Sequence, residues 1–282
     1  MKVVTKISEM TKAMLEEHRA GNSIGFVPTM GALHAGHLSL VEKSRKSNRI
    51  TVCSIFVNPI QFNNKKDLEK YPRNLKEDLG LLDAAGCDYV FTPETGEIYP
   101  AGMPVLDIKF GTLDKVLEGK FRPGHFKGVA IIVKKLFEII SPDHAYFGLK
   151  DYQQLLVIRH LVSVLKLPVQ IHSCPTFREP DGLAMSSRNL RLTIGEREMA
   201  SLIYETLCKV KKKAGHLPVK ELRQWAIKKI NSNPAFSVEY FEIVNKYDLH
   251  SLQSWREKEN ALAVTAVFLG DVRLIDNMEL FS

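Results

Sequence analysis

The chain has 282 residues, which is enough for one large domain or two unequal ones. Its hydrophobic content of 45% and charged content of 25% are those of an ordinary globular protein. No apolar stretch approaches the ~20 residues needed to span a bilayer, and the N-terminal segment is too polar for a signal peptide. We therefore expect a cytoplasmic protein with no membrane association.

The net charge of +7 favours anionic ligands. The basic residues are spread along the chain rather than gathered into a tail, so charge alone does not indicate nucleic-acid binding. Four cysteines are scattered without a CxxC pair, at Cys53, Cys87, Cys174 and Cys208. This spacing argues against zinc and disulfides, and we expect four reduced thiols.

Strand-like apolar runs alternate with helical patterns over the first two-thirds of the chain. Strands are expected at residues 23–27, 50–57, 88–91, 145–147 and 169–173. Helices are expected from residue 38 onward, at 75–85, from 129 to at least 140, and at 153–165. Pro28 is expected to end the first strand. The alternation predicts an α/β fold, a Rossmann-like parallel sheet with helices on both faces.

The last third of the chain has a different order of elements. Helices are expected at 196–213 and 219–230, followed by strands at 238–244, 262–269 and 272–276. Gly270-Asp271 between the last two strands is a two-residue hairpin signal. This order predicts a smaller C-terminal α+β domain. With the boundary near Thr176, the expected domains are residues 1–175 and 176–282.

The most informative segment lies where the first strand ends and a helix begins, and it runs from Pro28 to His37, PTMGALHAGH. Parallel α/β sheets bind ligands at this edge, and a helix N-terminus offers free N–H groups to phosphates. Gly31 lets an anion approach the main chain. His34 and His37 are expected to share one face of the first turn and to donate to phosphate oxygens. Histidines near a helix start are also common as surface residues or caps, so the motif needs support from elsewhere.

A second candidate phosphate segment runs from Gly182 to Asn189. Ser186 and Ser187 offer hydroxyls, and Arg188 offers a charge that binds phosphate in a bidentate manner. The same residues are equally suited to a capping loop before a following helix.

Two shorter segments carry a cation beside a glycine. Lys150 follows a strand that ends near Gly148, on the ligand side of the sheet; the alternative is an ordinary surface lysine. Arg122 lies in the turn before the helix at 129, and its alternative is a plain Pro-Gly turn.

Together these segments resemble a known family. His34-Ala35-Gly36-His37 with Met185-Ser186-Ser187-Arg188 looks like the signature pair of the HIGH nucleotidyltransferase superfamily. More narrowly, six stretches resemble the pantothenate synthetases in order and spacing: PTMGALHAGH, Asn58 to Phe62, Tyr71-Pro72-Arg73, Arg122 to Phe126, Lys150 to Gln154, and MSSRN.

The resemblance implies an ATP-dependent ligase. Its members condense pantoate with β-alanine to pantothenate, with ATP and Mg²⁺, through a pantoyl adenylate, and they release AMP and pyrophosphate. It implies catalytic roles for His37, His34, Lys150, Ser186, Ser187 and Arg188. It implies ATP contacts by Met30, Gly31, Ala32, Leu33, His34, Ala35, Gly36, His37, Gly148, Leu149, Lys150, Asp151, Phe177, Met185, Ser186, Ser187 and Arg188.

The resemblance also implies pantoate contacts by Gln61 and Gln154. Amides suit this role, since an amide both donates and accepts, as a ligand with two hydroxyls and a carboxylate requires. Asn58, Tyr71 and Arg122 are lesser candidates around the same ligands. The family also implies a homodimer, an N-terminal domain that binds ATP and pantoate, and a C-terminal domain that covers the active site.

Two positions depart from the family pattern, since Leu149 replaces a polar residue and Phe177 a small aliphatic one. Glu77 and Asp78 lie near the family's acidic residues, but magnesium often binds mainly phosphates and water, so no protein ligand is predicted.

Two other functions compete with this one. The first is an adenylyl transferase that acts on a phosphorylated cofactor, which would call for more cations near Gln61 and Gln154. The second is a tRNA-binding fragment, although the chain lacks an aromatic and basic stripe.

Overall fold

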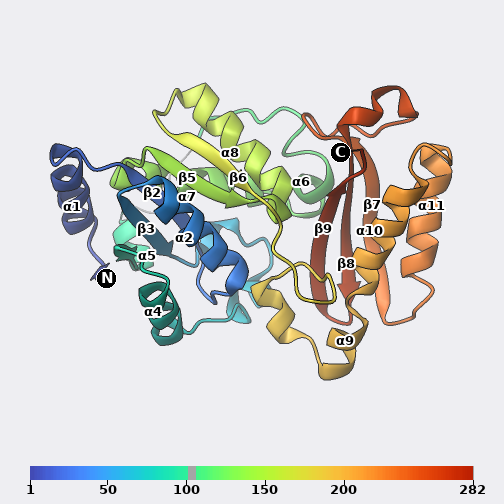
Figure 1. Cartoon of the computed structure of the whole chain (residues 1–282), viewed down its shortest axis with the longest axis horizontal. Coiled ribbons are helices and arrows are strands. Elements are labelled where there is room, and N and C mark those ends of the chain that lie inside the picture. The colour runs from blue at the N-terminus through green and yellow to red at the C-terminus, as the bar shows by residue number, and fades with distance from the viewer. Residues whose placement is uncertain (101–105, 282) are drawn as a thin grey trace. The chain divides into compact units, whose positions relative to one another are not determined.

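The computed structural model describes residues 1–100 and 106–281. It separates into two compact units with separate hydrophobic cores. Unit 1 comprises Met1–Leu149 and Gln153–Pro175, and unit 2 comprises Lys150–Tyr152 and Thr176–Ser282. Figure 1 shows the elements of both units along the chain. No helix within the described residues is long and apolar enough to cross a membrane.

Unit 1 is built on a six-stranded, wholly parallel sheet, which confirms the predicted fold class. Its strands are β1 (Lys2–Val4), β2 (Ile24–Thr29), β3 (Ile50–Ile55), β4 (Tyr89–Phe91), β5 (His144–Gly148) and β6 (Gln170–Cys174). Their spatial order is β1-β4-β3-β2-β5-β6. The chain therefore leaves β2 toward β3 on one side and later returns to β5 on the other. Such a reversal is where open α/β sheets bind ligands, at the carboxyl ends of the strands.

Helices cover both faces of this sheet, as the sequence predicts. The longer ones are α1 (Ile7–Arg19), α2 (Ala35–Ser47), α4 (Leu75–Ala84), α7 (His125–Ile140) and α8 (Tyr152–Leu165). The shorter ones are η1 (Pro59–Gln61), α3 (Lys65–Glu69), α5 (Thr95–Ile98), α6 (Leu117–Phe121) and η2 (Leu149–Asp151).

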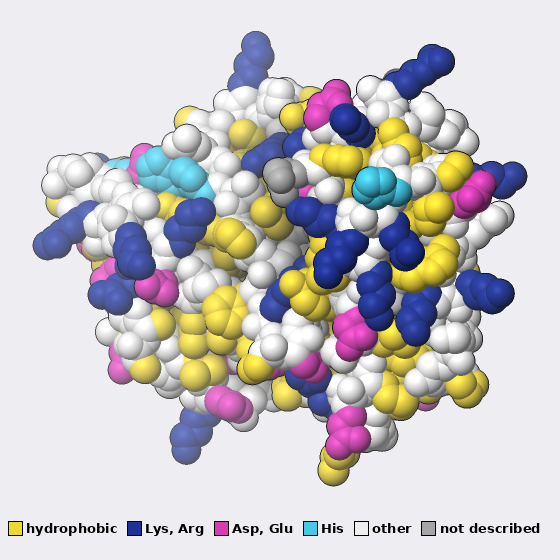
Figure 2. All heavy atoms as spheres, turned by 45° about the vertical axis from the view of Figure 1, so that its right-hand side comes forward, with side chains coloured by type: hydrophobic (Ala, Val, Ile, Leu, Met, Phe, Trp, Pro, Cys, Tyr) yellow, Lys and Arg dark blue, Asp and Glu magenta, His cyan; other side chains and the backbone are white. Residues whose placement is uncertain are grey.

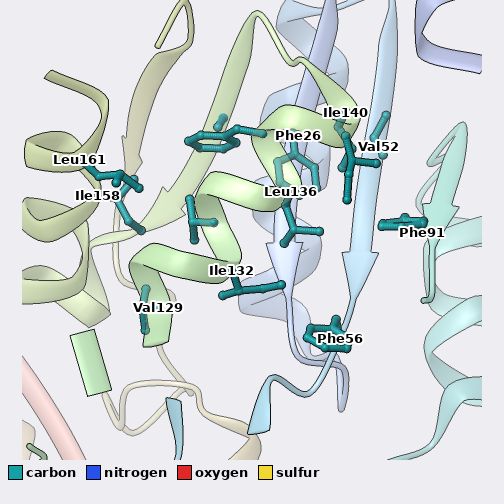
Figure 3. Packing of buried hydrophobic residues seen from close by; sticks show 14 of the residues in the cluster. Phe26, Val52, Phe56, Phe91, Val129, Ile132, Leu136, Ile140, Ile158 and Leu161 are labelled. Carbon is teal, nitrogen blue, oxygen red and sulfur yellow. The ribbon is translucent and has the colours of Figure 1, made fainter. Parts of the chain in front are cut away.

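Alternation along the strands divides the buried side chains between the two faces. Phe26 and Val52 pack with the apolar sides of α1 and α7, whereas their neighbours Val27 and Cys53 pack with α2 and α4. Figure 3 shows side chains of α7 directed toward Phe26 and Val52. Each fully buried aliphatic side chain of this kind stabilises the fold by about 1.5–3 kcal/mol.

The prediction that Pro28 ends the first strand is wrong, because β2 continues through Pro28 to Thr29. Pro28 pairs with Ser54 of β3, whereas the pairing of β2 with β5 covers only Gly25 and Phe26. The missing N–H of proline therefore falls beyond the segment that is paired on both sides. The following helix also begins earlier than expected, at Ala35 rather than at residue 38.

Unit 2 packs helices against a three-stranded antiparallel sheet of order β7-β8-β9. Its elements are η3 (Ser187–Arg191), α9 (Ile194–Met199), α10 (Leu202–Lys213), α11 (Val219–Ile230), β7 (Phe236–Asn245), η4 (Trp255–Asn260), β8 (Ala261–Leu269) and β9 (Val272–Glu279). The hairpin at Gly270-Asp271 joins β8 to β9 as expected, with Gly270 at φ +54°. Figure 2 shows Lys and Arg side chains lying among apolar and acidic ones on the face that it presents.

The single helix expected at 196–213 is in fact two, α9 and α10. Between them the backbone N–H of Ala200 bonds to Arg197 O, and that of Ile203 bonds to Ala200 O, both at 3.3 Å. These bonds span three residues instead of four, so the chain tightens locally and the α-helix is interrupted. The start of α9 is set by a capping box between Thr193 and Glu196.

Candidate active site

The two histidines of the PTMGALHAGH segment lie side by side at the N-terminus of α2. His34 is the N-cap, in extended conformation, and its Nδ1 accepts a hydrogen bond from the N–H of Gly36 at 3.2 Å. The Nδ1 of His37 accepts from the N–H of His34 at 3.3 Å, and the ring centroids are 4.0 Å apart.

These caps fix the tautomer of both rings. An Nδ1 that accepts a backbone N–H cannot carry a proton, so each neutral imidazole holds its proton on Nε2. Both histidines are therefore set as Nε2–H donors at a helix N-terminus, where the backbone and the helix dipole also favour an anion. The cap that the sequence offers as an alternative to a phosphate site is thus present, and it supports the donor role.

The loop before His34 is held from α4 by Asp78. This carboxylate is 2% exposed, and its two oxygens accept from the N–H groups of Ala32 at 2.9 Å and Leu33 at 2.7 Å. A Cβ on Gly31 would lie 2.9 Å from the carboxylate, and Gly31 has φ +79°. Ala32 also adopts a positive φ, of 50°, which is uncommon for a residue with a side chain. A buried carboxylate needs such donors, and here they shape the main chain around Gly31.

Gln61 lies in η1 and is 7% exposed. Its Oε1 accepts from Asn58 Nδ2 at 3.1 Å, and its Nε2 donates to the sulfur of Met30 at 2.9 Å. The Tyr99 hydroxyl donates to Asn58 Oδ1 at 2.9 Å. Burial raises the pKa of Tyr99, so that this hydroxyl stays protonated. The chain of bonds from Tyr99 through Asn58 leaves the amide of Gln61 with its N–H side toward Met30.

A second chain of contacts reaches the main chain of Gln61. His125, at the start of α7, places Nδ1 2.8 Å from the carbonyl oxygen of Gln61. Its Nε2 lies 3.2 Å from NH1 of Arg122, whose guanidinium is 3.6 Å from the carboxylate of Glu118. Arg122 thus supports the His125 contact with η1, in addition to any role toward a ligand. Tyr71 is buried and packs edge-to-face against Phe62, with ring centroids 5.8 Å apart.

The two neighbouring glutamines at the start of α8 differ. Gln153 is buried: its Oε1 accepts from the N–H of Glu118, and its Nε2 donates to the carbonyl oxygens of Leu113 and Val116. It therefore holds the segment before α6. Gln154, the predicted pantoate contact, is half-buried.

Lys150 follows β5 but belongs to unit 2. Its ammonium lies 3.3 Å from Asp151 Oδ1, and its side chain is 17% exposed. Its main-chain carbonyl accepts from Asn277 Nδ2 at 2.9 Å. Gly148 and Leu149 precede it in unit 1. Leu149, which replaces a polar residue of the family pattern, packs its side chain against the hydrophobic core of unit 1.

The MSSR segment of unit 2 is a short loop that leads into η3. Ser186 caps η3, with its Oγ accepting from the N–H of Arg188 at 3.2 Å, and Ser187 is buried. The N–H of Met185 bonds to the carbonyl oxygen of Phe177, so Phe177 lies across the base of the same loop with 43% of its surface exposed. The predicted phosphate contacts of Ser186 and Arg188 therefore start from a capped and ordered turn.

Several residues that organise these segments were not predicted as site residues. Asp78, Tyr99, Asp276 and Asn277 bond to predicted site residues or to the loops that carry them. Asp276 and Asn277 are 4% and 9% exposed, so they must be satisfied by specific partners, but this burial is evident only in the folded chain. No local pattern marks Tyr99.

Comparison with known proteins gives matches along the whole chain. The family described as Pantoate-beta-alanine ligase matches residues 2–279. The pantothenate synthetase of Azobacteroides pseudotrichonymphae is 48% identical over 279 residues and that of Bacteroides fragilis 46%, each covering 99% of both chains.

The chain is also similar to solved structures over its whole length. The crystal structure of pantothenate synthetase from Thermus thermophilus covers 100% of both chains with 41% identity and a TM-score of 0.93. That of pantoate-beta-alanine ligase from Francisella tularensis, complexed with beta-gamma ATP and beta-alanine, covers 99% of this chain and 98% of its own, with 36% identity and a TM-score of 0.84.

Proposed function

The chain belongs to the pantoate–β-alanine ligase family, the pantothenate synthetases, and on that premise we propose that it joins its substrates through an enzyme-bound pantoyl adenylate. It is a ligase that condenses pantoate with β-alanine and uses ATP. The observation that carries the proposed intermediate is the pair of Nε2–H donors on His34 and His37 at the N-terminus of α2.

In the first step an oxygen of the pantoate carboxylate attacks the α-phosphorus of ATP. The bond from that phosphorus to the oxygen bridging the β-phosphorus breaks, and pyrophosphate leaves with the electron pair. Negative charge grows on the phosphate oxygens, and donors that strengthen in this transition state lower the barrier. His34 and His37 supply such donors. Lys150, Ser186, Ser187 and Arg188 supply further donors and positive charge to the polyphosphate chain.

In the second step the β-alanine amine attacks the acyl carbon. The C–N bond forms, the amine loses a proton, and AMP leaves with the oxygen that came from the carboxylate. The Gln61 amide nitrogen has two N–H groups, and besides the bond to the Met30 sulfur it supplies a donor to a pantoate oxygen or to the β-alanine carboxylate. Gln154 supplies a second amide to pantoate.

The described residues offer no protein cage for Mg²⁺. Within residues 1–100 and 106–281 no group of three or more His, Cys, Asp or Glu side chains is placed to hold a metal ion. Both oxygens of Asp78 already accept backbone N–H groups, and a carboxylate oxygen of Glu77 accepts from Asn74. This donor set suits a magnesium ion that arrives on the phosphates of ATP and keeps its waters.

The order of steps is tested by pyrophosphate release from ATP in single-turnover reactions. Pyrophosphate is expected with pantoate alone, and AMP and pantothenate only after β-alanine is added. Equal release of pyrophosphate without pantoate would overturn the intermediate. A panel of other hydroxy acids run in the same assay measures how strictly pantoate is required.

The bond that breaks is tested with pantoate labelled with ¹⁸O in its carboxylate. Attack on the α-phosphorus places one labelled oxygen in AMP, as read by mass spectrometry. Label in pyrophosphate and none in AMP would instead indicate attack on the β-phosphorus and an acyl pyrophosphate, and label in inorganic phosphate would indicate an acyl phosphate.

The resemblance supports three further proposals, on domain roles, oligomeric state and location. Residues 1–175 are assigned the pantoate contacts and the PTMGALHAGH segment, and residues 176–282 the MSSR loop. A homodimer is expected, and light scattering on the eluting protein should give twice the chain mass of 31.9 kDa; a mass of one chain would exclude it. A cytoplasmic location fits four free cysteines and an ATP-dependent reaction, and cell fractionation tests it.

A further inference from the structure

Two adjacent polar residues of β9, Asp276 and Asn277, are almost fully buried in unit 2. They are 4% and 9% exposed, in a strand whose Val272, Leu274 and Met278 pack on the unit 2 core. Burial of an amide and a carboxylate is costly unless each is hydrogen-bonded, so their partners indicate what they are for. The partners lie in two segments that are far from β9 in the sequence.

Asn277 bonds to the segment of Lys150. Its Nδ2 donates to the carbonyl oxygen of Lys150 at 2.9 Å, across 127 positions of the sequence. Residues Lys150–Tyr152 form part of the same compact unit as β9, although the residues on either side of them belong to unit 1. The Asn277 amide therefore fixes the main chain from which the Lys150 ammonium extends.

Asp276 bonds to the stem of the MSSR loop through Arg178. The guanidinium donates to both carboxylate oxygens, at 2.7 and 2.9 Å, and also to the carbonyl oxygen of Gly182 at 3.0 Å. It lies 4.3 Å from the centre of the Tyr204 ring. Such a bidentate, stacked arginine has little freedom to move.

The stem that Arg178 holds leads directly to the proposed phosphate contacts. Arg178 pairs with Ala184 in an isolated antiparallel bridge, and Met185 follows at once. Gly182 closes the turn of this stem at φ +91°, where an added Cβ would lie 1.9 Å from a ring carbon of Tyr204. The turn is therefore seated tightly against α10.

We propose that Asp276 and Asn277 are positioning residues for the reaction: together they hold the Lys150 segment and the Ser186–Arg188 loop on neighbouring positions of one strand. The inference rests on the proposed roles of Lys150 and of the loop. Asn277 acts through the main chain of Lys150, and Asp276 acts through Arg178. The strand thereby sets the spacing between the two phosphate-binding segments before ATP binds.

The test is a double-mutant cycle between Asn277→Ala and Lys150→Ala, read as ATP affinity by calorimetry and as the single-turnover rate of pyrophosphate release. If Asn277 acts through Lys150, we expect Asn277→Ala to lower the ATP affinity or the single-turnover rate about tenfold in the wild-type background. In the Lys150→Ala background the same change should have an effect below about twofold. Asn233→Ala, which removes an asparagine bonded to Met199 and Ala235 in the same unit, is the matched control and should leave both quantities unchanged.

Independent losses that multiply in the double variant would overturn the inference while leaving the role of Lys150 intact. A Lys150→Ala protein with wild-type affinity and rate would instead overturn the proposed function of Lys150, and the premise with it.

A second cycle between Asp276→Asn and Arg188→Ala tests the other segment. Asp276→Asn keeps the shape of the side chain, and circular dichroism and thermal unfolding verify that each variant is folded. Multiplicative losses in this cycle would exclude Asp276 as a positioning residue.

Discussion

The Nδ1 atoms of His34 and His37 are occupied by backbone N–H groups, and this gives each of these rings two separable properties. One ring nitrogen caps the helix and the other is a donor. Asparagine and glutamine separate the two, because the asparagine amide oxygen reaches the position of Nδ1 and the glutamine amide nitrogen reaches that of Nε2.

We therefore expect His37→Asn to retain the cap and to slow adenylate formation by more than about tenfold, equivalent to ~1.4 kcal/mol of transition-state stabilisation. His37→Gln should retain more of the rate and less of the cap. Single-turnover pyrophosphate release and urea unfolding measure the two effects. An unchanged rate in His37→Asn would remove His37 from the mechanism.

Asp78 gives a second prediction for a single residue. In Asp78→Asn one of the two backbone N–H groups of Ala32 and Leu33 faces an amide N–H instead of an oxygen. An unsatisfied buried donor costs about 1–3 kcal/mol, so the free energy of unfolding should fall by that amount. Adenylate formation should slow as well, because the loop before His34 loses its support. Glu77→Gln, at an exposed neighbouring residue, is the control. Equal losses of stability and rate in the two variants would contradict a specific role of Asp78 in holding the loop.

At the scale of elements, α7 approaches η1 closely at Gly128. A Cβ there would lie 2.5 Å from the carbonyl oxygen of Ile60 and 2.7 Å from Cα of Gln61, both main-chain atoms. Gly128→Ala should therefore displace η1 and with it the amide of Gln61, raising the KM for pantoate. Overpacking of this kind costs about 1–3 kcal/mol of stability.

Gly80 offers a matched control for that substitution. It lies inside α4, and a Cβ there meets nothing within 4 Å. Gly80→Ala should stabilise the protein by about 0.5–1 kcal/mol and leave the KM for pantoate unchanged. If Gly128→Ala behaves in the same way as Gly80→Ala, the close approach of α7 to η1 does not constrain Gln61.

The edge of the sheet at β5 and β6 predicts a pH dependence of stability. His172 stacks on Tyr146, with centroids 4.9 Å apart, and its Nε2 is 3.0 Å from Nδ1 of His144. Burial, then His144 and then Lys43 lower the pKa of His172 below its ordinary value of 6.5. The unfolded chain binds the proton more readily, so this contribution to stability is complete above pH 6.5 and is lost as the pH falls through the folded pKa.

The free energy of unfolding should therefore decline as the pH is lowered below the ordinary histidine pKa of 6.5, and His172→Gln should flatten that decline. Urea titrations at a series of pH values measure it. His216→Gln, which changes an exposed histidine, is the control and should keep the wild-type slope. A slope in His172→Gln that equals the wild-type slope would assign the decline to other groups.

Elements with a strong hydrophobic period were predictable, and boundaries decided by a few hydrogen bonds or by strand pairing were not. The stripe of α7 from Val129 to Ile140 is visible in the sequence because every member is buried. The break at Ala200 depends on two backbone hydrogen bonds that span three residues instead of four, and the composition of the segment does not indicate it. The course of β2 through Pro28 depends on where β5 stops pairing, which is a property of the assembled sheet.

At the scale of the whole molecule, the sequence predicts the family and the parallel sheet because both rest on local patterns repeated in order. The main candidate site residues can also be recognised from local sequence, since His34, His37 and Lys150 each follow a recognisable strand end. Their supports are not local. Tyr99 reaches Gln61 through Asn58, and Asn277 reaches Lys150 across 127 positions, so only the folded chain brings them together.

The chain passes between its two units three times, after Leu149, after Tyr152 and after Pro175, because the short segment Lys150–Tyr152 belongs with the C-terminal residues. A chimera of two relatives joined at residue 175 would combine a lysine segment from one parent with the β9 of the other. Substitutions at 150–152 and at 276–277 are therefore expected to be compatible only as matched sets. For recombination, the C-terminal module of this enzyme consists of two pieces of sequence, and the smaller one is three residues long.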